Sequence, residues 1–580
     1  MIASKISPGR QSRTQRQQEL VAIPRRSGFA VSGTRPAATL LVALLLGCLF
    51  ACRSANIEPP PAASANAKPL VAKPAVAELP WLNNTAAPVI AGETFASWQP
   101  LRTFYNQRQN RPVWLVEHAP GADAKLLLDV LRAADLEGLR PADYHIPILT
   151  SGQLAGNELE LLLTDAALRY AHDQLTGRFD PRQMDPQWFI TPPVAPDVVS
   201  ALQTALDKHQ LAQWLQSLPP PHPAYAQLRK ALAEYRQLAA QGPWPMLEDG
   251  PKLKPGERDA RVPVLRQRLV SSGDLTAAEA ADATLYDHAL ADAVRAFQST
   301  QGLEPDGILG KTTRAALNVS PLQRVHQLQA NMERWRWLPR QFEARYIRVN
   351  MAGFDLQVEE NDSPVLSMQV IVGKQLLSTP AFNSRLTHII FNPYWTVPPS
   401  IAGKEILPKL KQDPGYLARE NLQVFADWGA AAEPIDPGGV DWSQYTERRF
   451  PFRLRQLPGP HNSLGRMKFL LPNAYAIYLH DTPSRRLFNK SVRALSHGCI
   501  RVQNPNALAE YLLRDSAKWN PATIDAAIAL KVTRTVPLPQ PIPIYMLYFT
   551  AWTDAEGAVQ FRDDIYSRDA KLAQTFENVN

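Results

Sequence analysis

The spacing of hydrophobic positions changes about halfway along the chain, from a helical to a strand-like period. Between residues 94 and 250 apolar side chains recur at intervals of three and four, as at Leu127, Leu128 and Leu131, which is typical of amphipathic helices. From about residue 345 polar and apolar side chains alternate over short runs that end at turn-forming residues, which predicts β-hairpins. The pattern therefore predicts a multidomain α+β protein in which helices precede a mainly-β domain.

A shorter unit with three helical stripes lies between these two parts, at residues 256–318. Its second and third stripes are separated by Asp306-Gly307 and Gly310, which permit a tight turn, and Thr312 or Thr313 can cap the helix that follows. We therefore expect a compact three-helix domain here.

Breaks in the pattern and runs of Pro and Ala give the expected boundaries. A segment at 402–459 interrupts the β-rich region and predicts a lid-like insertion of helices and loops. The expected parts are an export signal or membrane anchor at 1–52, a Pro/Ala-rich linker at 53–93, a helical scaffold domain at 94–250, the three-helix domain at 256–318, a connecting helix at 319–344, the β-rich domain at 345–540 and a C-terminal segment at 541–580 that packs on the body.

The first 52 residues have the order of an export signal: a basic stretch, an apolar run at 37–51 and small residues. The run is shorter than the roughly 20 residues that span a bilayer, so a signal sequence is favoured over an uncleaved anchor. Cys48 and Cys52 each lie in a context that resembles a lipoprotein processing site. The linker would then act as a tether that holds the body away from a membrane.

The net charge of +8 is concentrated in the same N-terminal segment. Seven basic residues lie within 1–52 against a single acid, Glu19, so the rest of the chain is close to neutral. A near-neutral body has no broad field for phosphate groups, which argues against nucleic acid as a partner.

Of the three cysteines, Cys499 is the one that lies outside the N-terminal segment. A single thiol cannot form an internal disulfide, so Cys499 is either a buried structural residue or a reactive nucleophile. The sequence contains no His-Glu-x-x-His motif, no Cys-x-x-Cys pair and no phosphate-binding glycine loop. No metal and no cofactor is therefore expected.

Two short motifs offer a base for this thiol: Tyr478-Leu479-His480-Asp481 and Ser496-His497-Gly498-Cys499-Ile500-Arg501. A catalytic thiol needs a base within hydrogen-bond reach. His497 precedes the thiol by two residues and would share its face of a strand, whereas His480 precedes it by 19 residues, a distance that suits a strand, a loop and a return. Gly498 gives the backbone freedom, and consecutive N–H groups there can form an oxyanion hole.

These two motifs resemble the catalytic signature of the L,D-transpeptidases of the YkuD type, in which a histidine is followed by [Ser/Thr]-His-Gly-Cys and then Arg or Asn. The segments 391–401 and 460–469 also match this family, in its large Gram-negative branch. That branch joins a helical scaffold, a wall-binding module and the catalytic domain. The resemblance runs from about residue 95 to the C-terminus and implies an L,D-transpeptidase fold, mainly β, for residues 345–540.

The unit at 256–318 is similar to the three-helix peptidoglycan-binding domain. The similarity rests on Phe297-Gln298, Asp306-Gly307, Gly310 and Thr313 at the family's spacing. A role as a structural spacer is the alternative for this unit.

The resemblance implies catalytic roles for six residues: Cys499 as nucleophile, His480 as its base, Asp481 through a backbone carbonyl that orients the base, His497 and Gly498 at the oxyanion site, and Arg501, which stabilises the site or meets a substrate carboxylate. Four further residues are expected to contact substrate: Tyr478, Trp395, Ser496 and Asn392. Many relatives have Gly or Ser in place of Asp481, a departure that a carbonyl role tolerates.

The implied reaction is a double acyl transfer on peptidoglycan. The thiolate attacks the bond between diaminopimelate and D-Ala in a tetrapeptide stem, and the amine of a second stem then resolves the thioester to give a 3→3 cross-link. Water as acceptor would make the protein a carboxypeptidase, and a lipoprotein lysine would make it an attachment enzyme. A non-enzymatic wall-binding protein is another alternative, although it needs neither His480 nor Cys499. A papain-like peptidase places the thiol before the histidine, the reverse of the order here.

The resemblance also implies the cellular setting of the protein. It predicts a periplasmic location, peptidoglycan stems as donor and acceptor, other cell-wall synthesis proteins as partners, and inhibition by carbapenems that acylate Cys499. The N-terminal segment would add a membrane tether.

Overall fold

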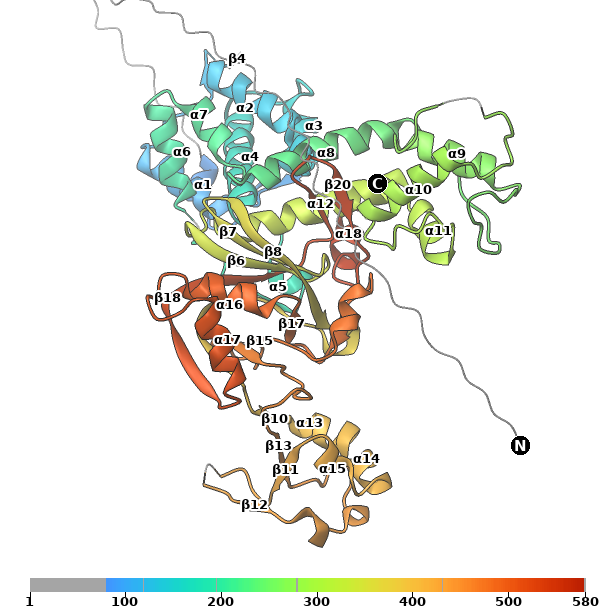
Figure 1. Ribbon diagram of the computed structural model, residues 1–580. Coiled ribbons are helices and arrows are strands. Elements are labelled where there is room, and N and C mark those ends of the chain that lie inside the picture. The colour runs from blue at the N-terminus through green and yellow to red at the C-terminus, as the bar shows by residue number, and fades with distance from the viewer. Residues whose placement is uncertain (1–79, 118, 195, 278–279, 430, 578–580) are drawn as a thin grey trace, which may run out of the picture. The chain divides into compact units, whose positions relative to one another are not determined.

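The computed structural model describes residues 80–577, except for 118, 195, 278, 279 and 430 (Figure 1). The predicted export segment, with Cys48 and Cys52, and most of the linker lie outside the described residues, so the predictions for them stay open. Within the described part of the chain, no helix is long and apolar enough to cross a membrane.

The first helical part is built around α4 (Gly156–Thr176), against which α1 (Trp98–Gln107), α2 (Ala122–Arg132) and α6 (Val198–Asp207) pack. α4 buries polar residues as well as leucines, and Glu160 accepts hydrogen bonds from the Tyr105 hydroxyl at 2.9 Å and the Val113 N–H at 2.6 Å. Smaller elements complete this part: β1 (Val89–Ile90), β2 (Glu93–Thr94), β3 (Leu115–Val116), β4 (Ala119–Pro120), α3 (Ile146–Leu149), α5 (Pro181–Met184), β5 (Trp188–Phe189) and α7 (Leu211–Ser217).

Two segments of the predicted 94–250 domain pack outside this core. α8 (Pro223–Ala240) lies along α12 (Pro321–Arg336), where Leu228 and Met332 belong to a separate apolar cluster. β5 joins the large sheet of the second half, with Trp188 paired to Ala381. A helical period does not reveal which surface a helix packs against, so the sequence grouped segments that belong to different cores.

The three-helix unit consists of α9 (Val262–Ser271), α10 (His288–Thr300) and α11 (Lys311–Leu317) around one apolar core. Buried Gln298 organises its turn. The Gln298 side chain donates to Asp306 at 2.9 Å and to Thr313 at 3.1 Å, and it accepts from the Gly307 N–H at 2.8 Å. The motif residues of this unit therefore hold one another and fix the start of α11.

α12 is a buried element rather than a plain connection. It begins with a capping box in which the Ser320 hydroxyl accepts from the Gln323 N–H at 3.2 Å and the Gln323 side chain accepts from the Ser320 N–H at 2.9 Å. Its last turns bury charged pairs: Arg336 contacts Glu333 at 2.9 Å, and Arg334 contacts Asp569 of the C-terminal segment at 2.6 Å.

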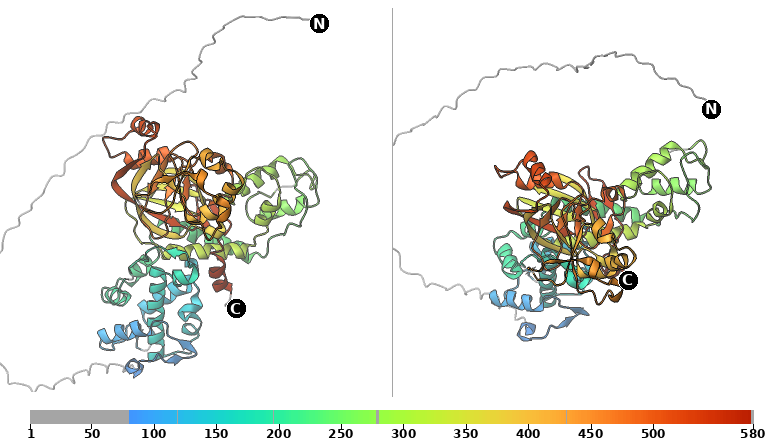
Figure 2. Two further views of the ribbon diagram at one scale, coloured as in Figure 1. Left: turned by 90° about the horizontal axis from the view of Figure 1, so that it is seen from below. Right: turned by 60° about the horizontal axis from the view of Figure 1, so that its bottom comes forward.

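The second half forms a large sheet (Figures 1 and 2). Its strands are paired in the order β14-β15-β17-β8-β7-β6-β18-β9-β5. The strands are β6 (Arg345–Asn350), β7 (Asp355–Glu360), β8 (Ser363–Gly373), β9 (Ala381–Phe391), β14 (Met467–Leu470), β15 (Leu479–His480), β17 (Ile500–Val502) and β18 (Arg534–Leu547), and β16 (Ala494–Ser496) pairs with β8. Because β9 pairs with β14 as well as with β18, the sheet closes on itself. Helices α16 (Pro505–Leu513) and α17 (Pro521–Ala529) contribute to the same apolar core. The predicted multidomain α+β class is confirmed.

The predicted insertion is a subdomain with its own sheet and core. Its strands β10 (Trp395–Thr396), β11 (Leu422–Phe425), β12 (Pro434–Ile435) and β13 (Arg453–Gln456) pair in the order β10-β13-β11-β12. Its helices are α13 (Pro399–Ile401), a π-helical turn at Ala402–Ile406, α14 (Leu407–Gln412) and α15 (Tyr416–Arg419). Pairing of Trp395 with Gln456 closes its base, so the folded unit begins before the predicted residue 402.

The predicted boundary at 540/541 falls inside β18 and is wrong, because the last residues of that strand, Ile544 to Leu547, pair with β6. After β18 the chain forms β19 (Ala551–Thr553), β20 (Val559–Phe561) and α18 (Ala570–Glu577). β19 and α18 both contact α12.

Candidate active site

Three neighbouring strands place Lys468, His480 and Arg501 in one row. Lys468 on β14 is paired with His480 on β15, which is paired in turn with Arg501 on β17. Side chains alternate between the two faces of a strand, so paired residues share a face. A neighbouring position on each strand is apolar. These residues, Phe469, Leu479 and Ile500, form a second row that lies in the buried core. The sheet thus presents polar side chains on one face because their apolar neighbours fill the other.

Cys499 stands at the entrance to β17 and lines a cavity of about 550 Å³ together with this polar row. Its thiol lies 3.7 Å from the carbonyl oxygen of Ala476. Burial raises the pKa of the Cys499 thiol above its ordinary value, and hydrogen bonds from Tyr478 and the charges of Lys468 and Arg501 offset this only in part. The thiol is therefore protonated in the free protein at neutral pH.

His480 is buried, and its ring is held by the main chain. Nδ1 lies 2.5 Å from the carbonyl oxygen of Asp481, so Nδ1 carries the proton and Nε2 is left as the basic nitrogen. Burial, together with the charges of Arg501 and Lys468, lowers the pKa of His480 to about 3 against the opposing effect of the Asp481 carbonyl. The imidazole is thus neutral and able to accept a proton.

The side chain of Asp481 anchors the carbonyl that orients the base. Its carboxylate accepts hydrogen bonds from the N–H groups of Arg466 at 2.8 Å and Thr482 at 2.6 Å, and it also bonds the Arg485 guanidinium. Gly465 leaves room for it, since a Cβ there would lie 2.3 Å from the Asp481 carboxylate. The aspartate at this position therefore fits the carbonyl role expected from the sequence.

The turn before Cys499 is closed by Ser496, which corrects two expectations. The Ser496 hydroxyl accepts from the Gly498 N–H at 3.0 Å and donates to the Cys499 carbonyl at 2.6 Å. The Ser496 hydroxyl thus holds the turn and is not free for a substrate, although the residue lines the cavity, and the Gly498 N–H is not free to bind an oxyanion. Gly498 has φ +114°, a conformation that favours glycine. The N–H of Cys499 itself donates to no group in the described part of the chain and is left for that role.

His497, the second candidate base, faces the insertion instead of the thiol. Its Nε2 lies 2.5 Å from the carboxylate of Glu405, in the π-helical turn, and both side chains are substantially exposed. Because His480 is buried beside the thiol and His497 is engaged by Glu405, the geometry favours His480 as the base.

The predicted substrate contacts divide into two groups. Tyr478 and Trp395 line the cavity with Cys499. Asn392 does not; it is buried elsewhere, and its side chain donates to the carbonyl oxygens of Ala527 at 2.9 Å and Val532 at 3.3 Å. Asn392 therefore anchors the end of β9 to α17, and its assignment as a substrate contact is wrong.

Several residues that the sequence analysis did not single out hold the turn that carries Cys499. The Thr379 hydroxyl donates to the carbonyl of Gly498 at 2.8 Å and accepts from the N–H of Gly373 at 3.1 Å. The Tyr566 hydroxyl donates to the carbonyl of Gly373 at 2.6 Å, and Arg568 donates to the carbonyl of Thr379 at 2.9 Å. Nothing in the sequence pattern linked Thr379 to Tyr566, which lies 187 positions further along the chain.

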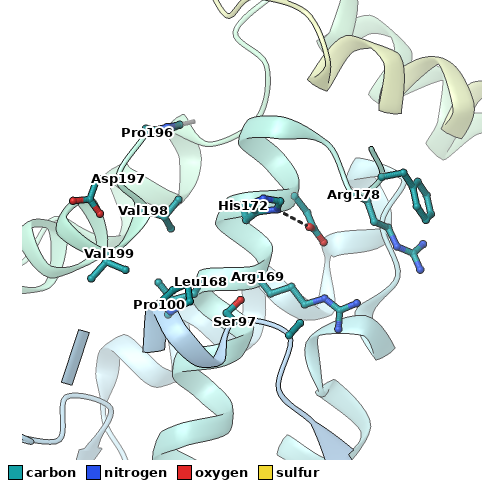
Figure 3. A pocket seen from close by; sticks show the side chains of 13 residues that line it. Ser97, Pro100, Leu168, Arg169, His172, Arg178, Pro196, Asp197, Val198 and Val199 are labelled. Atoms are coloured by element: carbon teal, nitrogen blue, oxygen red, sulfur yellow. Dashed lines mark hydrogen bonds and ion pairs between the residues drawn. The ribbon is translucent and has the colours of Figure 1, made fainter. Parts of the chain in front are cut away.

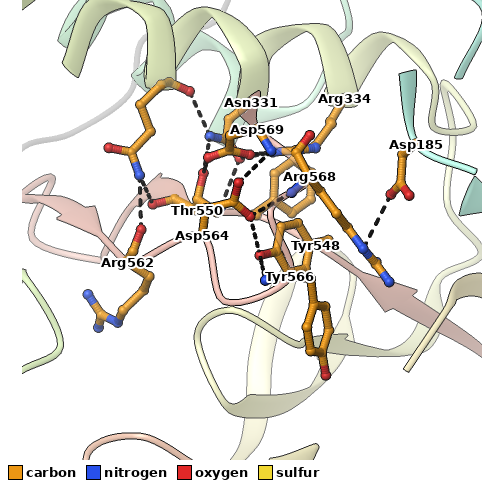
Figure 4. A network of polar contacts seen from close by, with 12 residues as sticks. Asp185, Asn331, Arg334, Tyr548, Thr550, Arg562, Asp564, Tyr566, Arg568 and Asp569 are labelled. Atoms are coloured by element: carbon orange, nitrogen blue, oxygen red, sulfur yellow. Dashed lines mark hydrogen bonds and ion pairs between the residues drawn. The ribbon is translucent and has the colours of Figure 1, made fainter. Parts of the chain in front are cut away.

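The C-terminal segment holds Tyr566 through the network shown in Figure 4. The Tyr548 hydroxyl accepts from the Tyr566 N–H at 3.0 Å and donates to Asp564 at 2.6 Å. Asp569 pairs with Arg334 on α12 at 2.6 Å. A continuous set of polar contacts therefore joins α12 to the turn that carries Cys499.

A second cavity, of about 700 Å³, lies in the helical part and is lined by Arg169, His172, Arg178 and Asp197, among others (Figure 3). His172 contacts Asp173 at 3.4 Å. No thiol lines this cavity, and among the described residues no group of His, Cys, Asp and Glu is arranged to hold a metal ion. Of these two cavities, the one at Cys499 brings a thiol together with a base.

Comparison with protein families gives three separate matches along the chain. Residues 99–232 match the model of a scaffold domain, and residues 258–317 match that of a "Putative peptidoglycan binding domain". Residues 344–525, which include Cys499 and His480, match the L,D-transpeptidase catalytic domain.

Individual relatives cover parts of the chain. A "Putative L,D-transpeptidase" of Haemophilus influenzae is 35% identical over 248 residues, which are 43% of this chain and 49% of the relative. The chain thus matches about half the length of that relative. Over 82 residues, 13% of this chain and 20% of the relative, it is 42% identical to the N-acetylmuramoyl-L-alanine amidase CwlM of Mycobacterium tuberculosis.

Solved structures of two L,D-transpeptidases are also similar. The one from Mycobacterium smegmatis covers 35% of this chain and 58% of its own at 12% identity, with a TM-score of 0.18. The one from Xylanimonas cellulosilytica covers 52% of this chain and 100% of its own at 16% identity, with a TM-score of 0.17. These scores are too low to carry an argument, which rests on the sequence matches.

Proposed function

We propose that this chain, whose residues 344–525 match the L,D-transpeptidase catalytic domain, is a cysteine acyltransferase that cross-links peptidoglycan stems through Cys499. The observation that carries the proposal is the cavity in which Cys499 meets a neutral, buried His480 whose Nδ1 is held by the Asp481 carbonyl. A thiol beside an oriented imidazole is the arrangement that nucleophilic catalysis requires.

In the first step His480 Nε2 takes the proton of the Cys499 thiol as the sulfur attacks the carbonyl that joins diaminopimelate to D-Ala. The tetrahedral oxyanion is stabilised by the free N–H of Cys499. The C–N bond then breaks, and His480 returns the proton to the leaving amine of D-Ala. The product is a thioester between Cys499 and the donor stem.

In the second step the amine of another stem attacks the thioester. His480 takes a proton from this amine, the C–S bond breaks, and the thiol is restored as the amide forms. The new bond links the third residues of two stems and gives a 3→3 cross-link. His480 thus accepts and returns a proton in each of the two half-reactions, which a neutral imidazole allows.

Water and a lipoprotein lysine are the alternative acceptors. The insertion supports an amine acceptor, because it lines the cavity with Trp395 and Glu405 and can limit access of water to the thioester. A wall-binding protein without catalysis would need neither the buried base nor the thiol.

We also propose that the protein acts in the periplasm, exported by its N-terminal segment and held at the wall by the three-helix domain. The support is the basic, apolar and small-residue order of residues 1–52 and the match of residues 258–317 to the wall-binding family. The order of the segments places a long linker between the export segment and the body.

The test is to incubate the purified full-length chain, alongside its Cys499→Ala variant, with disaccharide-tetrapeptide and to follow products by mass spectrometry. The proposal expects release of D-Ala and formation of dimers, both of which depend on Cys499. Release of D-Ala without dimers would identify a carboxypeptidase or an enzyme that uses another acceptor. Binding without turnover would favour the wall-binding protein.

A further inference from the structure

Lys468 and Arg501 stand on either side of His480 and are the two charged members of the polar row. Apolar residues bound the row, since Lys468 is paired with Ile390 on β9 and Arg501 with Ile371 on β8. Adjacent strands are about 4.8 Å apart, so the main chain of each cationic residue is one strand spacing from that of His480. All three side chains line the Cys499 cavity.

Neither cation has an ion pair with any acid in the described part of the chain. Lys468 Nζ lies 3.8 Å from the centroid of the Tyr478 ring, and the Nε of Arg501 is buried without a hydrogen-bond partner. Burial lowers the pKa of both groups. The acid that lines the cavity, Glu405, is already engaged by His497.

The other buried arginines of this chain have oxygen acceptors, either neutral ones, as for Arg268 with the Leu317 carbonyl and Arg324 with Gln301, or the carboxylates that face two arginines of α12. Arg334 contacts Asp569 at 2.6 Å, and Arg336 contacts Glu333 at 2.9 Å. A buried cation without a counter-charge is costly, so folds normally pair it. Two unpaired cations beside a nucleophile therefore fit an anion that the substrate brings.

We propose that Lys468 is a second member of a carboxylate-binding subsite with Arg501, for which the resemblance already implies such a contact, and that this subsite receives the free C-terminal carboxylate of the donor stem. This inference rests on the proposed function, in which the leaving residue carries the amine that His480 protonates. In an α-amino acid that amine and the carboxylate are attached to the same carbon. A carboxylate held one strand spacing from His480 therefore places the leaving amine beside the base.

The subsite selects the length of the donor stem. A stem with one more residue moves its carboxylate about 3.5 Å along the chain, and a C-terminal amide removes the charge. Either change leaves both cations unpaired when the scissile bond is at the thiol. The enzyme is therefore expected to discriminate against extended and amidated donors.

The same contact connects binding to catalysis. Arg501 and Lys468 lower the pKa of His480 while they lack a counter-charge. A bound carboxylate reduces that effect and leaves His480 a stronger base once the donor is in place. The other titratable groups that line the cavity are Tyr394, Glu405, Tyr475, Tyr478, His497 and Cys499.

The test compares two donors on the full-length chain: disaccharide-tetrapeptide with a free C-terminal carboxylate and the same compound with a C-terminal carboxamide. The wild-type chain should favour the free acid in kcat/KM by roughly tenfold to a hundredfold, the effect of one or two charge-assisted hydrogen bonds. Lys468→Met should reduce this preference at least fivefold, and Lys468→Arg should restore part of it. Lys518→Met, an exposed lysine of the same domain, is the matched control and should keep the full preference.

Binding measured without turnover separates this inference from the proposed function. Calorimetry on full-length Cys499→Ala should show tighter binding of the free acid than of the amide, and adding Lys468→Met should remove most of the difference. Absence of turnover by the wild-type chain with either donor would overturn the proposed function alone. The subsite would be overturned if Lys468→Met lowered kcat/KM equally for the free-acid and the carboxamide donor. It would also be overturned if the chain with both Cys499→Ala and Lys468→Met still bound the free acid more tightly than the amide by the same factor. Circular dichroism and the melting temperature of each variant verify that it is folded.

Discussion

The surroundings of His480 and Cys499 determine the protonation states of both side chains. The pKa of His480 falls to about 3, first because the ring is buried and then because Arg501 and Lys468 repel the imidazolium. The pKa of the Cys499 thiol is raised by burial. Both groups are consequently neutral at neutral pH in the free enzyme, and a thiolate–imidazolium pair is not stored before substrate binds.

The first prediction follows from these two shifts and concerns alkylation of Cys499 by iodoacetamide. A thiol whose pKa is raised holds less thiolate at a given pH than a free cysteine, and a histidine protonated only below about pH 3 supplies no imidazolium. The alkylation rate should be low near neutral pH and still be rising at about pH 9. Mass spectrometry of the peptide that contains Cys499 measures it separately from Cys48 and Cys52. A rate plateau between about pH 5 and 7 would contradict the neutral pair.

The sequence analysis identified the residues that would react directly with the substrate and missed those whose role depends on which residues they contact. Cys499 and His480 stood out because a catalytic thiol needs a base within reach. Lys468 did not, because a lone lysine on an alternating strand is normally a solvated side chain. Ser496 and Asn392 were misassigned because proximity to a motif does not reveal which way a side chain points.

The insertion is the element whose boundaries most affect function. Its apolar core includes Val397, Leu410 and Leu454, so it folds as a unit rather than as a loose cover. Its contact with the catalytic motif is the exposed pair of Glu405 and His497. Exposed ion pairs contribute little to stability, so this contact can open and close at small cost.

The second prediction is that removing the insertion shifts the reaction from transfer to hydrolysis. Thr396 and Arg455 are paired across β10 and β13, so residues 397–454 can be replaced by Asn-Gly, which closes a two-residue hairpin. The shortened enzyme should still release D-Ala, but hydrolysed stems should increase severalfold relative to cross-linked dimers. Product ratios by mass spectrometry measure the change. An unchanged ratio of transfer to hydrolysis would refute the lid role.

A milder variant controls for damage to the fold. Glu405→Gln removes the charge that holds His497 but keeps the subdomain and its core. It should shift the product ratio in the same direction by a smaller amount. Lys404→Met, next to it in the same turn, loses only the exposed contact with Glu447 at 3.3 Å and should leave the ratio as it is.

β18 shows why an element can escape detection in the sequence. Residues 534–547 contain Pro537, Pro539, Pro541 and Pro543, and proline lacks the N–H that a central strand donates. The structure accommodates them because β6 pairs with β18 only from Ile544 onward and the register with β9 shifts between Pro537 and Ile542. Pro539 and Pro541 thus lie in the irregular stretch, whereas Pro537 and Pro543 pair with β9 alone.

At the scale of the whole molecule, the C-terminal segment connects parts that are distant in the sequence. It pairs with α12 through Asp569 and Arg334 and reaches the nucleophile turn through Tyr566 (Figure 4). Motif spacing identified the kinds of domain in the chain, because each motif is local. It could not predict this packing, because the contacts join residues more than 100 positions apart.

The third prediction tests whether this connection positions the nucleophile. Thr379→Val removes the hydroxyl that donates to the Gly498 carbonyl, and Tyr566→Phe removes the one that donates to the Gly373 carbonyl. Each should lower kcat roughly tenfold while KM changes less than twofold, because the turn loses its geometry and the substrate contacts remain. Thr379→Ser, which keeps the hydroxyl, should retain most of kcat.

Tyr235→Phe is the control for that experiment, since the Tyr235 hydroxyl makes no hydrogen bond to any described residue although its ring packs against Phe561. If Tyr566→Phe and Thr379→Val lower the melting temperature but leave kcat at the level of Tyr235→Phe, the network only stabilises the fold. A fall in kcat that is rescued by Thr379→Ser at similar melting temperature means that the C-terminal segment holds the Cys499 turn in its reactive geometry. Because that segment is itself fixed to α12, the rate of acyl transfer then depends on contacts far outside the catalytic sheet.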